Sequence, residues 1–315
     1  MPELPEVQTT VTGLQKKITD LTITNLWSNS FSMAYVNRNN HKNKDYFVKL
    51  QQKVTGKNII GVTRRGKHIL IILSSGETLV IHMKMTGHLM HGVYEYIPRV
   101  SASQNVYAAW GPWIPKIKDS PLSDPYNRHI RTMFTLQNKE GKESHLAFCD
   151  SRKFGTIELF SANDLQQKIG KLGPEPLEPS FTFKVFKEVL SKKRSGYIKS
   201  VLLDQTVLVG VGNIYSDEAL HLAHILPTRD VTSLSETERN KLYQSIRQVL
   251  TSGIHFGGDS MSDYRNVDGE RGAFQGKHLV YLRTGKPCVK KDCSGIIEKK
   301  TIGGRSGHYC PLCQK

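Results

Sequence analysis

Four of the five cysteines lie close to the end of the chain and form two pairs: Cys288 with Cys293, and Cys310 with Cys313. Four residues separate the members of the first pair, two separate those of the second, and sixteen lie between the pairs. Two such pairs on the turns of a hairpin can place four thiolates tetrahedrally around Zn²⁺, at about 2.3 Å. Four free thiols are the alternative. Because four thiolates fill the coordination sphere, the pattern predicts one structural zinc, and His308 is expected to contact a partner rather than the metal.

The N-terminus offers a second kind of chemistry. The small residue at position 2 favours removal of Met1, which would leave Pro2 with a free secondary amine. Such an amine can attack a sugar carbon at the aldehyde level and form an iminium, and part of it is neutral at physiological pH. Glu3 and Glu6 lie beside it at a predicted helix start and can act as proton donor and acceptor. A structural role is the alternative, since acidic residues at helix starts are common for dipole reasons alone.

A glycine-containing turn is the third candidate. Residues 210–215 read GVGNIY and lie between two helical patterns. The glycines permit a tight turn, and Asn213 is expected to be the N-cap of the next helix. Turns of this kind expose backbone N–H groups that bind phosphate. A plain connection between helices is the alternative.

The elements that must position these residues change in character along the chain. An apolar stripe predicts a helix from Pro5 to Thr19. Short β-rich runs with turn signals between several of them then suggest an antiparallel sandwich or barrel. The runs are Leu21–Trp27, Ile59–Thr63, His68–Leu73, Thr78–Met83, Ile130–Leu136, His145–Cys149 and Thr156–Phe160. Cys149 is expected to be a core residue of its strand. The aperiodic segment 95–124, with Trp110 and Trp113, is expected to be an inserted surface loop.

The second half of the chain has a different pattern. Three prolines and two glycines in residues 170–179 predict a linker. Helical patterns follow, and the last one opens on a capping box of Ser235 and Glu238. The end of the chain, from about Leu279, reads as two strands that carry the cysteines.

Length and charge narrow the class of protein. The chain has 315 residues, enough for two domains, and 44 Lys and Arg against 28 Asp and Glu, a net charge of +16. No apolar run approaches the length of a transmembrane helix, and the first residues do not resemble a signal peptide. The cysteine pattern suits a reducing cytosol. The charge favours a polyanionic partner such as nucleic acid.

Several motifs together resemble the formamidopyrimidine-DNA glycosylase / endonuclease VIII family of base-excision repair enzymes. They occur in the family's order and cover nearly the whole chain except the 95–124 insertion. The motifs are MPELPEV at 1–7, RRGKH at 64–68, HMKMTG at 82–87, DSRKFG at 150–155, LGPEPL at 172–177, LLDQTVLVGVGNIYSDEAL at 202–220, GGDSMSDYRNVDGERGAFQ at 257–275 and the cysteine hairpin.

The resemblance implies a bifunctional DNA glycosylase and AP lyase. Its implied catalytic residues are Pro2 as the Schiff-base nucleophile, Glu3 as general acid/base, Glu6 as a second carboxylate and Lys67 at the lesion-side phosphate. Among its implied DNA contacts, Lys199, Asn213 and Arg305 bind phosphates. Met85, Arg152 and Phe154 fill the void left by a flipped base, and His129 is a further DNA contact. Without the resemblance, Met85, Arg152 and Phe154 would be interpreted as a sheet core with an ion-paired arginine. The implied reaction ends in β- and then δ-elimination.

Loop 257–275 resembles the branch that removes oxidised purines, namely 8-oxoguanine and formamidopyrimidines. The chain departs from the family in three places. The first cysteine pair encloses four residues where two are usual, Lys84 stands where glycine is usual, and the 95–124 insertion has no counterpart. An oxidised-pyrimidine glycosylase of the same family and a catalytically silent lesion-binding zinc protein are the alternatives.

The implied fold is α+β. An N-terminal helix and an antiparallel β-sandwich form a catalytic domain over 1–165, and a linker spans 166–180. A helix-two-turns-helix domain spans 181–278, and a zinc-ribbon β-hairpin spans 279–315. The implied cofactor is one structural Zn²⁺, and the implied partner is damaged double-stranded DNA, with no membrane. The protein is expected to be a monomer in a prokaryotic cytoplasm, associated with nucleoid DNA.

Overall fold

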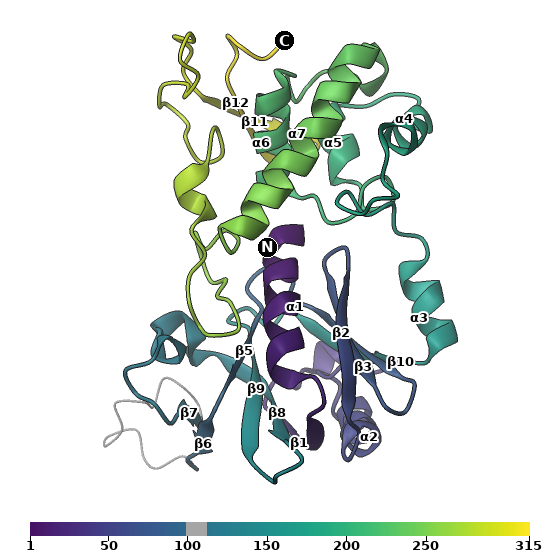
Figure 1. Ribbon diagram of the computed structural model, residues 1–315, viewed down its shortest axis with the longest axis vertical. Coiled ribbons are helices and arrows are strands. Elements are labelled where there is room, and N and C mark those ends of the chain that lie inside the picture. The colour runs from purple at the N-terminus through teal and green to yellow at the C-terminus, as the bar shows by residue number, and fades with distance from the viewer. Residues whose placement is uncertain (99–111) are drawn as a thin grey trace. The chain divides into compact units, whose positions relative to one another are not determined.

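The computed structural model describes residues 1–98 and 112–315, and the chain divides into two units (Figure 1). Unit 1 consists of Met1–Pro2, Glu6–Gly170 and Asp259–Gly272, and unit 2 of Glu3–Pro5, Lys171–Gly258 and Ala273–Lys315. This division departs from the domains expected from the sequence, because residues 259–272 belong to unit 1. Val267 packs into the core of unit 1, and its carbonyl accepts the His91 N–H at 2.7 Å.

The predicted N-terminal helix is present as α1, Leu4–Ile18. Val7, Val11, Leu14 and Ile18 form one buried stripe along it, as the spacing of three and four residues requires. A second helix, α2 (Lys44–Val54), was not predicted. The Asn43 side chain caps it by accepting the backbone N–H groups of Asp45 and Tyr46.

Two antiparallel four-stranded sheets form most of unit 1. One has the order β1-β8-β9-β5 and the other β10-β4-β3-β2. The seven predicted strands are all present with ends shifted by at most two residues, and β5 is additional. The bounds are β1 Thr22–Ser28, β2 Ile59–Arg65, β3 His68–Leu73, β4 Thr78–His82, β5 His88–Gly92, β8 Ile130–Gln137, β9 Glu143–Cys149 and β10 Thr156–Phe160.

The two sheets share one hydrophobic core with α1 and α2. Phe134 and Phe148 enter it from one sheet, Ile69 and Ile81 from the other, and Phe47 from α2. Each such side chain contributes about 1.5–3 kcal/mol when it leaves water. The predicted β-sandwich is therefore confirmed. Cys149 is fully buried in a smaller neighbouring cluster, as predicted.

The segment 95–124 is not simply a surface loop, and that prediction is wrong at its ends. Strand β7 (Trp113–Pro115) pairs with β6 (Tyr94–Tyr96). Trp113 is buried there and packs edge-to-face against Trp27 with ring centroids 6.0 Å apart. Aromatic packing of this kind holds a strand that has no alternating pattern. Trp110 lies outside the described residues.

Helix α3 (Ala162–Ile169) closes unit 1 and occupies the first residues of the predicted linker. Residues 170–182 follow without a helix or strand. The helices of unit 2 are α4 (Phe183–Ser191), α5 (Ile198–Leu203), α6 (Asn213–Ala223) and α7 (Glu236–His255). α7 packs against α6 (Figure 1), and it begins with the predicted capping box. Gly212 rather than Asn213 is the N-cap of α6, so that prediction is wrong.

A β-hairpin ends the chain, with β11 (Glu298–Ile302) paired to β12 (Arg305–Tyr309). Its two-residue turn, Gly303-Gly304, has positive φ at both positions (55° and 76°), which glycine adopts without strain. The α+β fold expected from the sequence is thus confirmed in both units. Among the described residues, no helix combines the length and the apolar character needed to span a membrane.

Candidate active site and zinc centre

The Glu3 carboxylate lies at the N-terminus of α6. Oε1 accepts the Ile214 N–H at 2.9 Å, and Oε2 accepts the Tyr215 N–H at 3.4 Å. A Cβ at Gly212 would overlap this carboxylate, so the position requires glycine. The first N–H groups of a helix have no partner within it, and they favour an anion. The predicted phosphate-binding turn therefore holds a carboxylate of the chain itself.

Glu6 holds the segment Asp259–Gly272 against α1. Its Oε1 accepts the Asp259 N–H at 2.8 Å, and its backbone carbonyl accepts the Tyr264 hydroxyl at 3.0 Å. Burial raises the pKa of Tyr264, which keeps the hydroxyl protonated as the donor. Pro2 is also buried, directly before Glu3 in the chain. The structure thus gives both N-terminal carboxylates fixed positions.

Lys67 lies in the two-residue turn between β2 and β3. The turn is braced by Arg64, whose side chain donates to Gln8 of α1 at 2.9 Å and to the Gly66 carbonyl at 3.0 Å. Gly66 has φ 57°, a conformation that favours glycine. The Lys67 side chain is only 6% exposed. A predicted phosphate-contacting lysine therefore lies in a turn that Arg64 attaches to α1.

Met85, Arg152 and Phe154 project from the sandwich rather than into it. Met85 is 38% exposed and Phe154 is 44% exposed, and the Arg152 guanidinium stacks over the Phe154 ring at 4.6 Å from its centroid. The interpretation as a sheet core therefore does not hold for these residues.

Two short loops carry these three side chains, and a buried hydrogen bond links the loops. The Thr86 hydroxyl donates to the Asp150 carboxylate, which also accepts the Gly155 N–H at 2.6 Å. Lys84 adopts φ 55° just before Met85. This left-handed conformation gives a physical reason for a glycine to be usual there.

His129 is half-buried at the end of the insertion. Its carbonyl accepts the Asp150 N–H at 2.9 Å, so it lies beside the loop that carries Arg152. Partial burial, together with nearby Arg131 and Arg128, lowers the pKa of His129. The neutral ring lines a cavity of about 260 Å³ with Tyr126 and Asp263.

Lys199 is placed differently from the prediction. Its side chain is 0% exposed, and its ammonium is ion-paired with Asp217 and lies 3.4 Å from the Ser216 hydroxyl. A direct phosphate contact is not available in this conformation. The Asp217 carboxylate also accepts the backbone N–H of His308 at 2.9 Å and contacts its Nδ1 at 3.1 Å. His308 is therefore buried and does not face a partner, contrary to the prediction.

Arg305 is exposed at the start of β12, immediately after the Gly303-Gly304 turn. Its neighbour Ser306 accepts a hydrogen bond from the Asn213 amide at 3.4 Å. A Cβ at Gly303 would overlap the Ser200 hydroxyl of α5. The hairpin therefore packs closely against α5 and α6, while Arg305 is open to solvent, as are residues 298–301 of β11.

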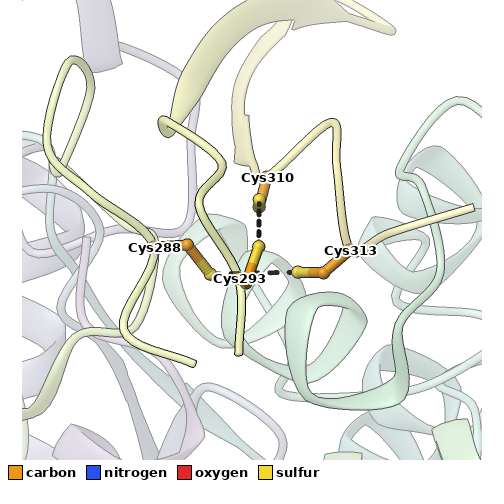
Figure 2. A group of neighbouring side chains, drawn as sticks. All are labelled: Cys288, Cys293, Cys310 and Cys313. Carbon is orange, nitrogen blue, oxygen red and sulfur yellow. Dashed lines mark hydrogen bonds between the residues drawn. The ribbon is translucent and has the colours of Figure 1, made fainter. Parts of the chain in front are cut away.

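The four predicted cysteines converge on one point (Figure 2). The sulfurs of Cys293 and Cys310 are 3.6 Å apart, those of Cys288 and Cys313 are 3.8 Å apart, and all four lie within 4.8 Å of one another. A tetrahedron with Zn–S bonds of about 2.3 Å has edges of about 3.8 Å. The residues therefore fit one structural zinc, which would link the two ends of the hairpin. All four ligands come from the chain, so the metal has no open position for a substrate.

Not all the residues that hold this site together were identified from the sequence. Asp217 and Glu218 are consecutive buried acids in α6, and the Glu218 carboxylate accepts the N–H groups of Leu279, Val280 and Tyr281 at 2.7–3.0 Å. Burial raises the pKa of Glu218, although these three hydrogen bonds oppose the shift. Two adjacent acids in the middle of a helix, followed directly by Ala219 and Leu220, were a usable signal for buried partners.

Comparison with known proteins agrees with this arrangement. Residues 1–157 match the N-terminal domain of formamidopyrimidine-DNA glycosylase, 172–265 match its H2TH domain, and 285–315 match the zinc finger found in FPG and IleRS. The formamidopyrimidine-DNA glycosylase of Pelotomaculum thermopropionicum is 39% identical, over 100% of this chain and 99% of its own. That of Heliobacterium modesticaldum is 37% identical over the full length of both.

Solved structures show the same likeness. A complex between Lactococcus lactis Fpg and DNA containing an abasic site has a TM-score of 0.78 and 30% identity, covering 99% of both chains. A complex between a point mutant of the L. lactis protein and DNA containing Fapy-dG has the same TM-score and identity, with full coverage. The fold and the cysteine centre together define a zinc-hairpin protein built from a β-sandwich and a helix-two-turns-helix unit. The chain belongs to the formamidopyrimidine-DNA glycosylase family.

Proposed function

We propose that this protein is a bifunctional DNA glycosylase and AP lyase that removes oxidised purines from damaged double-stranded DNA. The observation that carries the proposal is the position of Glu3. Its buried carboxylate is fixed by two N–H groups of α6, directly beside the residue that would supply the amine. A general acid/base must be held in place to act on a neighbouring nucleophile.

In the proposed reaction, the Pro2 nitrogen attacks C1′ of the damaged nucleotide once Met1 has been removed. The bond between C1′ and the base breaks, and the base leaves with a proton supplied by Glu3. Loss of the amine proton and protonation of O4′ then break the C1′–O4′ bond, which opens the sugar ring and leaves an iminium between the Pro2 nitrogen and C1′. This iminium acidifies the 2′ hydrogen, so loss of that proton breaks the C3′–O bond in β-elimination. A second proton loss then breaks the C5′–O bond in δ-elimination. Water finally releases the sugar fragment and restores the amine.

DNA binding would use residues of each unit. Lys67 and Arg305 would contact phosphates, which position the duplex without reading its sequence, and Asn213 would act at the start of α6. Lys199 would act indirectly, by fixing α5 to α6 through Asp217. The net charge of +16 suits this polyanionic partner.

Extrusion of a base from the duplex costs a few kcal/mol. Met85, Arg152 and Phe154 would offset that cost by filling the space that the base leaves, and their exposed side chains support this role. His129 would contact the DNA beside them. Loop 257–275 would then select the oxidised purine. The protein would act as a monomer in the cytoplasm, on nucleoid DNA.

The test is a cleavage assay with duplexes carrying 8-oxoguanine, a formamidopyrimidine, an oxidised pyrimidine or an abasic site. We expect cleavage of the first two and of the abasic duplex, and covalent trapping by borohydride only while the amine is free. Pro2→Gly should still bind DNA but lose most cleavage, and a protein that retains Met1 is the matched control. Preferential cleavage of the oxidised-pyrimidine duplex would contradict the proposed oxidised-purine substrate. DNA binding without cleavage or trapping would indicate a catalytically silent lesion-binding protein.

A further inference from the structure

His221, in the last turn of α6, faces the cysteine centre and has no role in the proposed reaction. Its Nε2 lies 3.4 Å from the Cys288 sulfur and 3.8 Å from the Cys313 sulfur. The side chain is fully buried. The four cysteines form the complete ligand set among the described residues, and His221 is not one of them.

The charge on the sulfurs determines whether Nε2 of His221 donates or accepts the hydrogen bond. Zinc carries +2 and four thiolates carry −4, so the loaded centre has a net charge of −2 in a buried place. A lone pair on Nε2 would repel that charge, whereas an N–H would donate to it. The other ring nitrogen, Nδ1, is buried with no hydrogen-bond partner among the described residues. The favoured tautomer therefore carries its hydrogen on Nε2.

The unusual spacing of the first cysteine pair brings a second contact to the same helix end. Lys290 is one of the four residues between Cys288 and Cys293. Its ammonium donates to the His221 carbonyl at 3.2 Å and to Nε2 of His224 at 2.7 Å. A cation is favourable at a helix C-terminus, where the last carbonyls have no partner within the helix.

His224 makes a further contact between the end of α6 and the cysteine centre. Because its Nε2 accepts from Lys290, its Nδ1 is free to donate to the Cys313 carbonyl, 3.2 Å away. One end of α6 is thus in contact with both cysteine pairs. The four-residue segment between Cys288 and Cys293 thus carries its own contact to α6, through Lys290.

We propose that His221 and Lys290 form an outer shell that retains the zinc. His221 donates its Nε2–H to the thiolates of Cys288 and Cys313, and Lys290 fastens the loop between Cys288 and Cys293 to the end of α6. The proposal rests on the cysteine centre and not on the proposed activity, so each can fail without the other. Partners of this kind typically change metal affinity 10- to 100-fold.

The test measures zinc retention in the full-length, zinc-loaded protein, by competition with a chromophoric chelator. His221→Phe keeps the ring volume but removes the donor, and we expect its zinc affinity to fall about 10- to 100-fold. Lys290→Met should lower it less, because the thiolates keep their donor. The matched control is His255→Phe, at an exposed histidine in the last turn of α7. Affinity of His221→Phe within twofold of the control would overturn the proposal.

Two measurements on the wild-type chain keep the proposal testable if the variant does not fold. With ¹⁵N-labelled histidine, the zinc-loaded protein should show His221 protonated at Nε2 and bare at Nδ1. The opposite tautomer would overturn the proposal. Cobalt substituted for zinc should give the absorption of four sulfur ligands, and a spectrum of three sulfurs and one nitrogen would make His221 a ligand and also overturn it.

Discussion

Asp217 is the residue whose removal should most disturb unit 2. Its carboxylate receives the Lys199 ammonium and two nitrogens of His308, and all three residues are at most 1% exposed. Asp217→Ala would leave the Lys199 ammonium buried with only neutral oxygens nearby, those of Ser216 and Asn213. It would also release β12 from α6, and with it the strand that begins at Arg305.

The expected loss follows from the cost of an unpaired buried charge. Breaking a buried ion pair by removing one partner costs about 3–5 kcal/mol, against a total stability of about 5–15 kcal/mol for a domain. Asp217→Ala combined with Lys199→Met removes both charges and should be more stable than Asp217→Ala alone. The backbone N–H of His308 would still lack its acceptor, which costs about 1–3 kcal/mol.

Urea unfolding followed by two probes can measure this loss. All three tryptophans, at 27, 110 and 113, lie in the Glu6–Gly170 segment of unit 1, so their fluorescence reports unit 1. Circular dichroism reports the helices of both units, so a shift seen by dichroism but not by fluorescence reports unit 2. The control is Glu236→Gln, at an exposed ion pair with Lys187 in unit 2, which should leave both transitions unchanged. Asp217→Ala with an unchanged dichroism transition and unchanged DNA affinity would refute the reasoning.

Four further outcomes are expected. Cys310→Ser should lower zinc content and DNA affinity together, as metal analysis and a binding titration would show, whereas Arg305→Ala should keep its zinc and lose only DNA affinity. Phe154→Ala should leave the melting temperature nearly unchanged, because the ring is 44% exposed, but it should reduce base excision more than cleavage of an abasic duplex. A large fall in melting temperature with an unchanged ratio of base excision to abasic-site cleavage would show that the ring serves the protein core instead. Burial and nearby Lys42 lower the pKa of His41 from 6.5 to about 3, so the unfolded chain binds the proton first as pH falls. The free energy of unfolding should therefore decline below about pH 6.5 by up to about 1.4 kcal/mol per pH unit, and His41→Gln should flatten that decline in urea titrations at pH 7 and pH 5.

Local patterns in the sequence predicted the strands and α1 because each element buries one regular face. Helix α2 was missed although Phe47, Leu50 and Val54 have helical spacing, because its lysine-rich surface hides a narrow apolar stripe. Strand β7 could not be predicted, since its partner β6 and the aromatic rings that hold it are distant in the sequence.

In the candidate site, too, features set by nearby residues could be predicted from the sequence, and features set by residues far apart in the sequence could not. The cysteine spacing was sufficient to predict the zinc centre. The burial of Lys199 depends on Asp217, which lies on another helix. The adjacent acids at 217 and 218 signal a buried partner, but no local pattern identifies that partner as Lys199. The place of residues 259–272 in unit 1 depends likewise on Glu6 and on the core contact of Val267.

The central claim is that the Pro2 nitrogen is the nucleophile, and peptide mapping of a trapped complex tests it most directly. The protein would react with a duplex containing 8-oxoguanine in the presence of borohydride, and after digestion mass spectrometry would locate the reduced sugar fragment. We predict that the fragment is on the N-terminal peptide, bonded to the nitrogen of Pro2, with Met1 absent. A fragment bonded to a lysine such as Lys67, in a protein that is fully active, would contradict the claim.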